Sequence, residues 1–296
     1  MHISYSDTYT VPLPEGHRFP MEKYRLLRDT LLAEGVVAAG ELHEAVPVHP
    51  EQLLVAHSAR YVNTYCDGTV DPKIVRRIGI PWSPAFVRRS LASVGGTLAA
   101  ARAALHDGLA GNLAGGTHHA FRDAGEGYCV FNDIAVAALT LLEEGAVRRV
   151  AVVDLDVHQG NGTAAILGGD DRCFTLSMHG RNNYPFTKIP SAIDIDLDDG
   201  TGDDAYLSLL AGALHAVMAF GPEVIFYQAG VDPLHCDRLG RLALTHEGLM
   251  ERDRMVLAAG RGAGLPLVLT LGGGYAQPIT ETVRAHVNTY RVALNR

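Results

Sequence analysis

Three ionisable side chains occupy alternate positions in the segment Asp154-Leu-Asp-Val-His158. The apolar residues before them predict a buried strand over 149–157, on which Asp154, Asp156 and His158 share one face. Such a face is costly to bury unless a cation compensates. In open parallel sheets, ligands bind at the carboxyl ends of strands. The alternatives are a bound metal ion and a solvated strand end with a salt bridge, and we favour the metal.

A further ligand is available at Asp232, which follows a second apolar segment, 223–230. Asp156, His158 and Asp232 with one water would give the four-coordinate, partly open arrangement of catalytic zinc. Because Asp232 precedes Pro233, a role in forming a turn is the alternative. We predict one Zn²⁺ per chain, although Fe²⁺ or Co²⁺ also suits these ligands.

Two glycine-rich segments carry groups that can take part in proton transfer. One places His118 and His119 side by side after Gly115. In such a pair, one imidazole can orient or stabilise charge while the other moves protons, and a plain polar loop is the alternative. The other, Gly272-Gly-Gly-Tyr275, offers a hydroxyl that either donates to a developing oxyanion or only covers the core.

Signatures of other catalytic classes do not occur. The glycine run at 272–274 lacks the Lys-Ser or Lys-Thr ending of a phosphate-binding loop. There is no G-x-S-x-G segment, and no cysteine stands in a Cys-His signature. Water activated by a metal is therefore favoured over a nucleophile from the protein. This predicts hydrolysis of a polarised bond.

Composition limits the partners and the compartment. The 296 residues carry a net charge of −8, which predicts no direct nucleic-acid binding and fits a cationic substrate or partner better. The four cysteines form no C-x-x-C pair, so a reducing compartment is expected. No signal-like start and no long apolar run are present, so we expect a cytoplasmic protein without a membrane partner. The oligomeric state is not indicated.

Short apolar runs alternate with helical patterns along the chain, which is typical of a parallel α/β architecture. We predict an α/β fold with a single three-layer domain over residues 1–296, in which helices flank a mainly parallel sheet. The expected strands are 149–157, 173–179, 223–230 and 265–272, and the expected helices are 83–108, 132–145, 203–220 and 246–262.

The sequence resembles the zinc-dependent histone deacetylases of the arginase/deacetylase fold, most closely the class IV branch and its bacterial relatives. The matching segments occur in the family's order and span most of the chain. They are GGTHHAFRDAGEGYCVFND (115–133), DLDVHQGNGT (154–163), TLSMH (175–179), AGVDPLHCDRLG (229–240) and LGGGY (271–275).

The resemblance implies roles for individual residues. It implies zinc on Asp156, His158 and Asp232, and Tyr275 as the oxyanion donor. His118 and His119 would be the catalytic pair, with Asp154 and Asn161 as their respective partners. The neutral Asn161 is expected to make it harder for His119 to hold a proton. The resemblance also implies a structural K⁺ at Asp154, Ser177 and the backbone oxygens of Asp156, His158 and Met178, and a substrate channel lined by Gly127, Tyr128 and Tyr184. Ordinary half-buried aromatic residues are the alternative for the two channel tyrosines.

The expected activity is removal of acetyl or longer acyl groups from the ε-amine of lysine in a protein or peptide. A deacetylase of acetylpolyamines or other small acylated amines is the first alternative. An arginase-like enzyme with two manganese ions would need more bridging carboxylates than the sequence shows. A catalytically silent module that binds acyl-lysine is the alternative from another class.

The segment 70–82 precedes the first long expected helix. Asp71 is a candidate for the acidic rim residue that some deacetylases use to hold the substrate backbone. The apolar residues of this segment either line the rim and admit longer acyl chains or pack the segment onto the protein. They are Ile74, Val75, Ile78, Ile80 and Trp82.

Overall fold

A computed structural model describes residues 1–296 and contains one eight-stranded sheet in the order β2-β1-β3-β8-β7-β4-β5-β6. Every strand pair in it is parallel, which confirms the predicted α/β fold. The strands are β1 (His2–Tyr5), β2 (Leu42–Glu44), β3 (Leu109–Asn112), β4 (Val150–Asp154), β5 (Cys173–Gly180), β6 (Ile193–Leu197), β7 (Val224–Gln228) and β8 (Leu267–Thr270).

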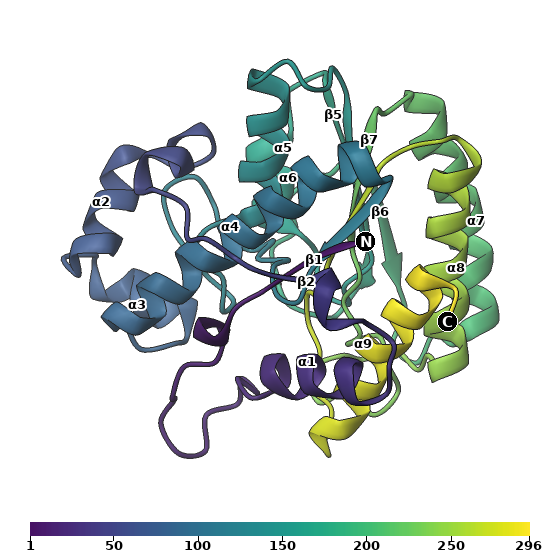
Figure 1. Ribbon diagram of the computed structural model, residues 1–296, viewed down its shortest axis with the longest axis horizontal. Coiled ribbons are helices and arrows are strands. Elements are labelled where there is room, and N and C mark those ends of the chain that lie inside the picture. Colours follow the sequence, from purple (N-terminus) through teal and green to yellow (C-terminus); the bar gives the residue numbers. More distant parts are fainter.

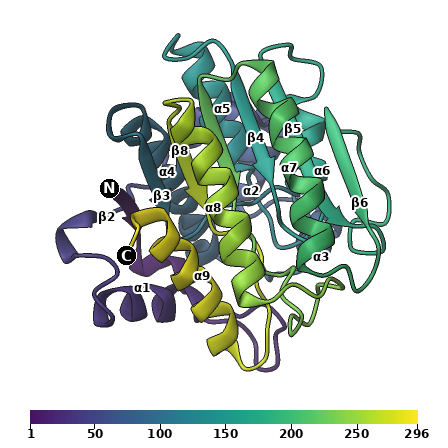
Figure 2. The same ribbon diagram turned by 90° about the vertical axis from the view of Figure 1, so that its right-hand side faces the viewer.

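Helices cover both faces of the sheet (Figures 1 and 2). In Figure 2, α7 and α8 lie in front of the central strands, and α4 and α5 lie behind them. None of the helices is both long and apolar enough to span a membrane. The helices are α1 (Lys23–Ala33), α2 (Ala59–Asp67), α3 (Pro72–Ile78), α4 (Pro84–Asp107), α5 (Asp133–Glu143), α6 (Asn161–Leu167), α7 (Asp203–Phe220), α8 (His246–Gly262) and α9 (Ile279–Leu294).

The central strands are apolar on both faces because each face is covered. In β4, Val150 and Val152 pack into the cluster that contains α4 and α5. Ala151 and Val153 pack into the cluster that contains α7 and α8. The two-residue period of a strand thus divides one apolar run between two cores. This arrangement leaves only the carboxyl ends of the central strands to carry polar side chains.

The predicted helix ends agree closely with the structure. Ser83 caps α4 by accepting a hydrogen bond from the backbone N–H of Phe86, and Gly108 ends that helix in the left-handed conformation. Asn132 caps α5 by accepting from the backbone N–H of Ala135. These local signals define the two helices that pack together behind the strands.

Three of the four predicted strands were too long at their carboxyl ends, whereas β5 matches the predicted 173–179 to within one residue. β4 ends at Asp154, so Asp156 and His158 lie in the loop that follows. These two residues therefore do not share a strand face with Asp154. β7 and β8 also end before the polar residues that follow them. Once the chain leaves the sheet, backbone turns direct the side chains, and the alternation of a strand no longer applies.

The strands β1, β2, β3 and β6 and the helices α1, α2, α3, α6 and α9 were not predicted, and of these strands β2 and β6 form the two edges of the sheet. In β6, half-exposed and exposed residues alternate up to the buried Leu197, and β2 has three residues, none of them buried. Edge strands of this kind lack the continuous apolar run that marks a central strand.

The segment 70–82 forms α3 and packs onto the protein. Ile78 and Ile80 are buried, and Ile74, Val75 and Trp82 pack against the same core. Asp71 caps α3 by accepting from the backbone N–H of Lys73. Of these residues, only Ile78 reaches the large pocket described below. The apolar residues are therefore core residues, and Asp71 is a helix cap outside the pocket.

One buried ion pair on α8 ties together the loops that follow β4 and β7. Arg252 is fully buried and pairs with Asp253 at 2.8 Å. Its Nη1 donates to the carbonyl oxygens of Leu155 (3.3 Å) and Gly230 (2.6 Å). The two loops are thereby held from below by one guanidinium group.

Replacing Arg252 should therefore destabilise the fold strongly. Arg252→Met leaves the Asp253 carboxylate buried without its partner, and we expect a loss of about 3–5 kcal/mol in the free energy of unfolding. Arg254→Met, on the exposed side of the same helix, is the matched control and should change it by less than about 0.5 kcal/mol. Urea unfolding followed by circular dichroism measures both, and equal losses in the two variants would contradict the tethering role.

Candidate functional site

Three predicted metal ligands meet at the carboxyl edge of the sheet. Asp156 and His158 follow β4, and Asp232 follows the neighbouring β7. Nδ1 of His158 lies 3.0 Å from Oδ1 of Asp156 and 3.1 Å from Oδ2 of Asp232. One ligand atom from each residue lies within 4.8 Å of the others, and all three residues are buried. No other group of three or more His, Cys, Asp or Glu side chains in the chain could hold a metal ion.

Backbone N–H groups hold the two carboxylates in place. Gly273 donates to Oδ2 of Asp156 at 2.6 Å, and Val157 donates to Oδ1 of Asp232 at 2.9 Å. A Cβ atom at Gly273 would lie 1.8 Å from Oδ2 of Asp232, so only glycine fits there. The glycine run after β8 therefore positions the ligands, a role that the sequence did not reveal.

The charges in this cluster fit a divalent cation. Burial and the nearby Asp156 raise the pKa of Asp232. Burial opposes a charge on His158, but Asp156 and Asp232 raise the pKa of its imidazole to about 10. Both shifts show that this place favours positive charge. The ligand atoms of a tetrahedral zinc site lie about 3.3 Å from one another. The distances from Nδ1 of His158 to the two carboxylate oxygens, 3.0 and 3.1 Å, are close to this value.

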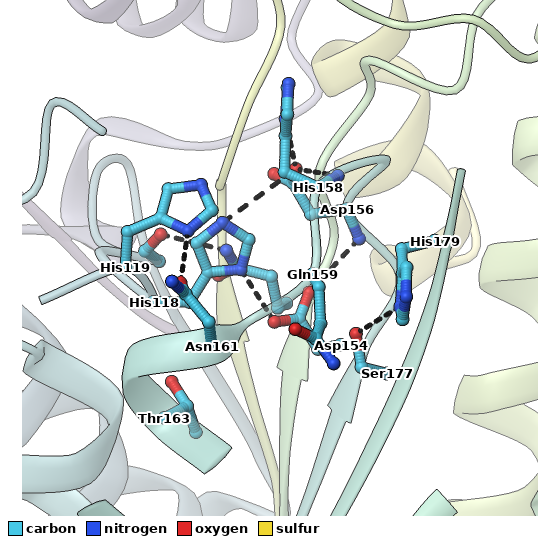
Figure 3. A network of polar contacts seen from close by, with 12 residues as sticks. His118, His119, Asp154, Asp156, His158, Gln159, Asn161, Thr163, Ser177 and His179 are labelled. Atoms are coloured by element: carbon cyan, nitrogen blue, oxygen red, sulfur yellow. Dashed lines mark hydrogen bonds and ion pairs between the residues drawn. The ribbon is translucent and has the colours of Figure 1, made fainter. Parts of the chain in front are cut away.

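The two adjacent histidines lie beside this cluster, each held by a different partner (Figure 3). Nδ1 of His118 lies 2.7 Å from Oδ2 of Asp154. Nδ1 of His119 lies 2.7 Å from Oδ1 of Asn161. The pairings expected from the resemblance are therefore present in the structure.

The two imidazoles have opposite proton affinities. Burial disfavours a charge on His118, yet the Asp154 and Asp156 carboxylates raise its pKa to about 8. Burial, with the neighbouring His118 and His158, lowers the pKa of His119 well below its usual value. The pKa of His119 is low, as expected, but burial is the main cause, and the hydrogen bond with Asn161 acts in the opposite direction by raising this pKa. One histidine of the pair thus favours the proton and the other lacks it.

Two carboxylates that the sequence analysis did not single out support this pair. Glu126 is buried and accepts a hydrogen bond from Nδ2 of Asn161 at 2.8 Å. Since the amide nitrogen of Asn161 points at Glu126, its oxygen must face His119. Asp133 accepts from the backbone N–H groups of Gly116 (3.0 Å) and Thr117 (2.7 Å), which fixes the loop before the histidines.

Available sequence signals for these residues were weak. Glu126 stands between two glycines, a setting that suggests a turn, and Asp133 lies at the start of the helix expected over 132–145. Asp237 is a third such residue, because its carboxylate accepts from the backbone N–H groups of Leu239, Gly240 and Tyr275. Each acts through contacts between distant segments, which spacing in the sequence does not show.

A pocket of about 570 Å³ leads to the cluster. His119, His158 and Tyr275 lie at its buried end. Gly127, Tyr128 and Tyr184, the predicted channel residues, also line it. A smaller cavity of about 30 Å³ adjoins this end, and Tyr275 lines both spaces. The structure thus brings the predicted channel and tyrosine to one place.

The residues expected to hold K⁺ also lie close together. Asp154 and Ser177 are paired residues of the neighbouring strands β4 and β5, and Met178 follows Ser177. Oγ of Ser177 lies 2.9 Å from Nδ1 of His179. The arrangement is compatible with the expected site, and the K⁺ ion stays a prediction.

Comparison with known proteins gives the family. Residues 17–290 match the model of the histone deacetylase domain. The chain belongs to the histone deacetylase family. It is 46% identical over 294 residues to an uncharacterized protein of Picosynechococcus, an alignment that covers 98% of this chain and 97% of that protein. It is 32% identical to Histone deacetylase 2 of Arabidopsis thaliana, with 95% of this chain and 76% of that protein covered.

A solved structure supports the same assignment. The crystal structure of a histone deacetylase homologue from Aquifex aeolicus aligns with a TM-score of 0.85 at 26% identity, covering 99% of this chain and 83% of that chain. Membership in this family supports a metal-dependent deacetylase.

Removing one carboxylate of the cluster should abolish metal binding. Asp232→Asn reduces the negative charge that holds the ion, so we expect zinc to fall from about one per chain to well below half. Atomic emission after dialysis against zinc and then buffer gives the content. Asp204→Asn, an exposed aspartate on α7, is the control and should retain the ion. Unchanged zinc content in Asp232→Asn would place the ion elsewhere.

Proposed function

We propose that this protein is a zinc-dependent amidohydrolase that removes a short acyl group from the ε-amine of lysine. The observation that carries the proposal is the junction of the Asp156, His158 and Asp232 cluster with His119 and Tyr275 at the end of one pocket. Asp156, His158 and Asp232 would hold the zinc, which would supply Lewis-acid chemistry by polarising an amide carbonyl and making water more acidic.

In this proposal, His119 is the general base. Its Nδ1–H donates to Oδ1 of Asn161, which leaves Nε2 without a proton and able to accept one from water. As that proton moves, the water oxygen bonds to the amide carbon. The C–N bond then breaks, and the leaving amine takes a proton from the histidine pair. The products are a carboxylate and a free amine.

Tyr275 stabilises the charge that develops on the carbonyl oxygen. Its ring centroid lies 6.2 Å from that of His158, and the loop that carries it is fixed by Asp237 through the Tyr275 N–H at 2.6 Å. A hydroxyl held in advance at this position stabilises an oxyanion without reorganisation.

The large pocket and the small inner cavity would each hold a different part of the substrate. The inner cavity of about 30 Å³ has room for only about two water-sized groups, which suits the methyl of an acetyl group. The alkyl stem of lysine would lie between Tyr128 and Tyr184 in the larger pocket. Longer acyl chains have no comparable space beyond the ligands, so acetyl is the favoured group.

The alternatives receive less support. A two-manganese centre lacks the required ligands, because the chain holds one cluster suited to a metal. A cationic polyamine would meet arginines at the pocket mouth, among them Arg18 and Arg238, so the local charge favours a cationic substrate less than the net charge of the chain does. A silent binding module would not need His119, Asn161 and Tyr275 arranged around the same ligands.

Loss of the Tyr275 hydroxyl should slow turnover with little effect on folding. For Tyr275→Phe we expect kcat on an acetyl-lysine peptide to fall by about 10²–10³ with a similar Tm. Release of acetate and thermal unfolding are measured on the same preparation. Tyr290→Phe, which removes a buried hydroxyl away from the pocket, is the matched control. Wild-type turnover in Tyr275→Phe would remove the hydroxyl from the mechanism.

Glu126 should matter through its effect on Asn161. Glu126→Ala removes the acceptor that orients the Asn161 amide, so we expect kcat to fall about tenfold or more while KM changes little. Glu126→Gln keeps an acceptor oxygen and should recover much of that loss. Arg77→Gln breaks the ion pair with Glu126 but leaves the Asn161 contact. Equal values of kcat for Glu126→Ala and Glu126→Gln would contradict the role of Glu126 in orienting Asn161.

A further inference from the structure

The mouth of the pocket differs in charge from the rest of the protein. Arg18, Arg77, Arg238 and Arg241 line it, and no Asp or Glu side chain does. The chain as a whole carries a net charge of −8. The positive charge is therefore local to the entrance, where a field acts most strongly on an approaching substrate.

Two of these arginines already have acidic partners. Arg77 pairs with Glu126, and Arg241 pairs with Asp199 at 3.2 Å. Their charges are partly neutralised by these contacts. They contribute less to the field at the mouth than an unpaired guanidinium does.

The other two arginines form no ion pair within the chain. Arg18 and Arg238 are both exposed, and neither contacts a carboxylate. Asp237 precedes Arg238, but its carboxylate accepts from backbone N–H groups, including that of Tyr275. Two guanidinium groups are thus available to a ligand on the side of the pocket that faces solvent.

The geometry also indicates which part of a substrate would contact Arg18 and Arg238. The acyl group fits the inner cavity of about 30 Å³, and the amine stem passes Tyr128 and Tyr184. The part of the amine beyond its stem then lies at the mouth. For an acylated lysine, this part is the backbone and its neighbouring side chains.

We propose that the enzyme prefers substrates with a carboxylate next to the acylated lysine side chain, bound by Arg18 and Arg238. A guanidinium group can bind a carboxylate with two parallel hydrogen bonds, which suits it to this task. The carboxylate comes either from acidic residues beside the acetyl-lysine of a peptide or from the α-carboxylate of free Nε-acetyl-lysine. This inference names the substrate class and rests on the proposed function.

Three peptides that differ only in charge test the preference. Acetyl-lysine is flanked by two glutamates, two glutamines or two lysines, and kcat/KM is measured for each at low salt. We expect the acidic peptide to exceed the lysine peptide by about tenfold or more, and the ratio to fall towards one in about 0.5 M salt. Equal values at low salt would overturn the proposal.

Reversing the charge of Arg18 and Arg238 tests whether these two residues cause the preference for the acidic peptide. The double variant Arg18→Glu/Arg238→Glu should invert the order of the acidic and lysine peptides. The matched control Arg148→Glu/Arg254→Glu makes the same change in net charge away from the pocket and should keep the wild-type order. An unchanged order in the mouth variant would overturn the proposal even if wild-type protein prefers the acidic peptide.

Two further measurements separate the possible outcomes. Hydrolysis of free Nε-acetyl-lysine compared with its α-amide shows whether the α-carboxylate alone is recognised. If no peptide is hydrolysed, the proposed function fails, and fluorescence anisotropy with labelled versions of the same peptides still decides the charge preference. Stronger binding of the acidic peptide, reversed in the mouth variant, would support the inference, and equal binding would overturn it.

Discussion

The structure depends on keeping the carboxylates of Asp156 and Asp232 and the imidazole of His158 together in the interior of the protein. Asp156 and Asp232 repel each other there, and burial removes the water that would screen them. A divalent cation bound between them and His158 would turn this cost into an attraction. The parallel sheet makes the arrangement possible, because β4 and β7 are neighbours and deliver these residues to the same edge.

The contacts around the ligands are as specific as the ligands themselves. Gly273 approaches both carboxylates closely enough to exclude any side chain, and Arg252 holds the backbone below each loop. Asn161 and Glu126 fix the orientation of His119 in the same way. A ligand set held so firmly loses little entropy when it binds an ion or a substrate.

The sequence predicted the centre of the protein better than its periphery. The apolar runs of β4, β7 and β8 are local signals, and their alternation with helical patterns predicted the fold class. The spacing of Asp156, His158 and Asp232 suggested the ligands, and the structure brings them together. Half-exposed edge strands have no such pattern. Glu126, Arg252 and the arginines at the mouth act between segments distant in the sequence, so only the folded chain shows what they contact.

We propose that one metal ion bound in this cluster makes the site an amide hydrolase. Titrating zinc into metal-free protein while following acetate release from an acetyl-lysine peptide tests it directly. We expect no turnover before zinc is added and a linear rise that ends at one ion per chain. Turnover that is unaffected by complete removal of metal, or that needs two ions per chain, would contradict it.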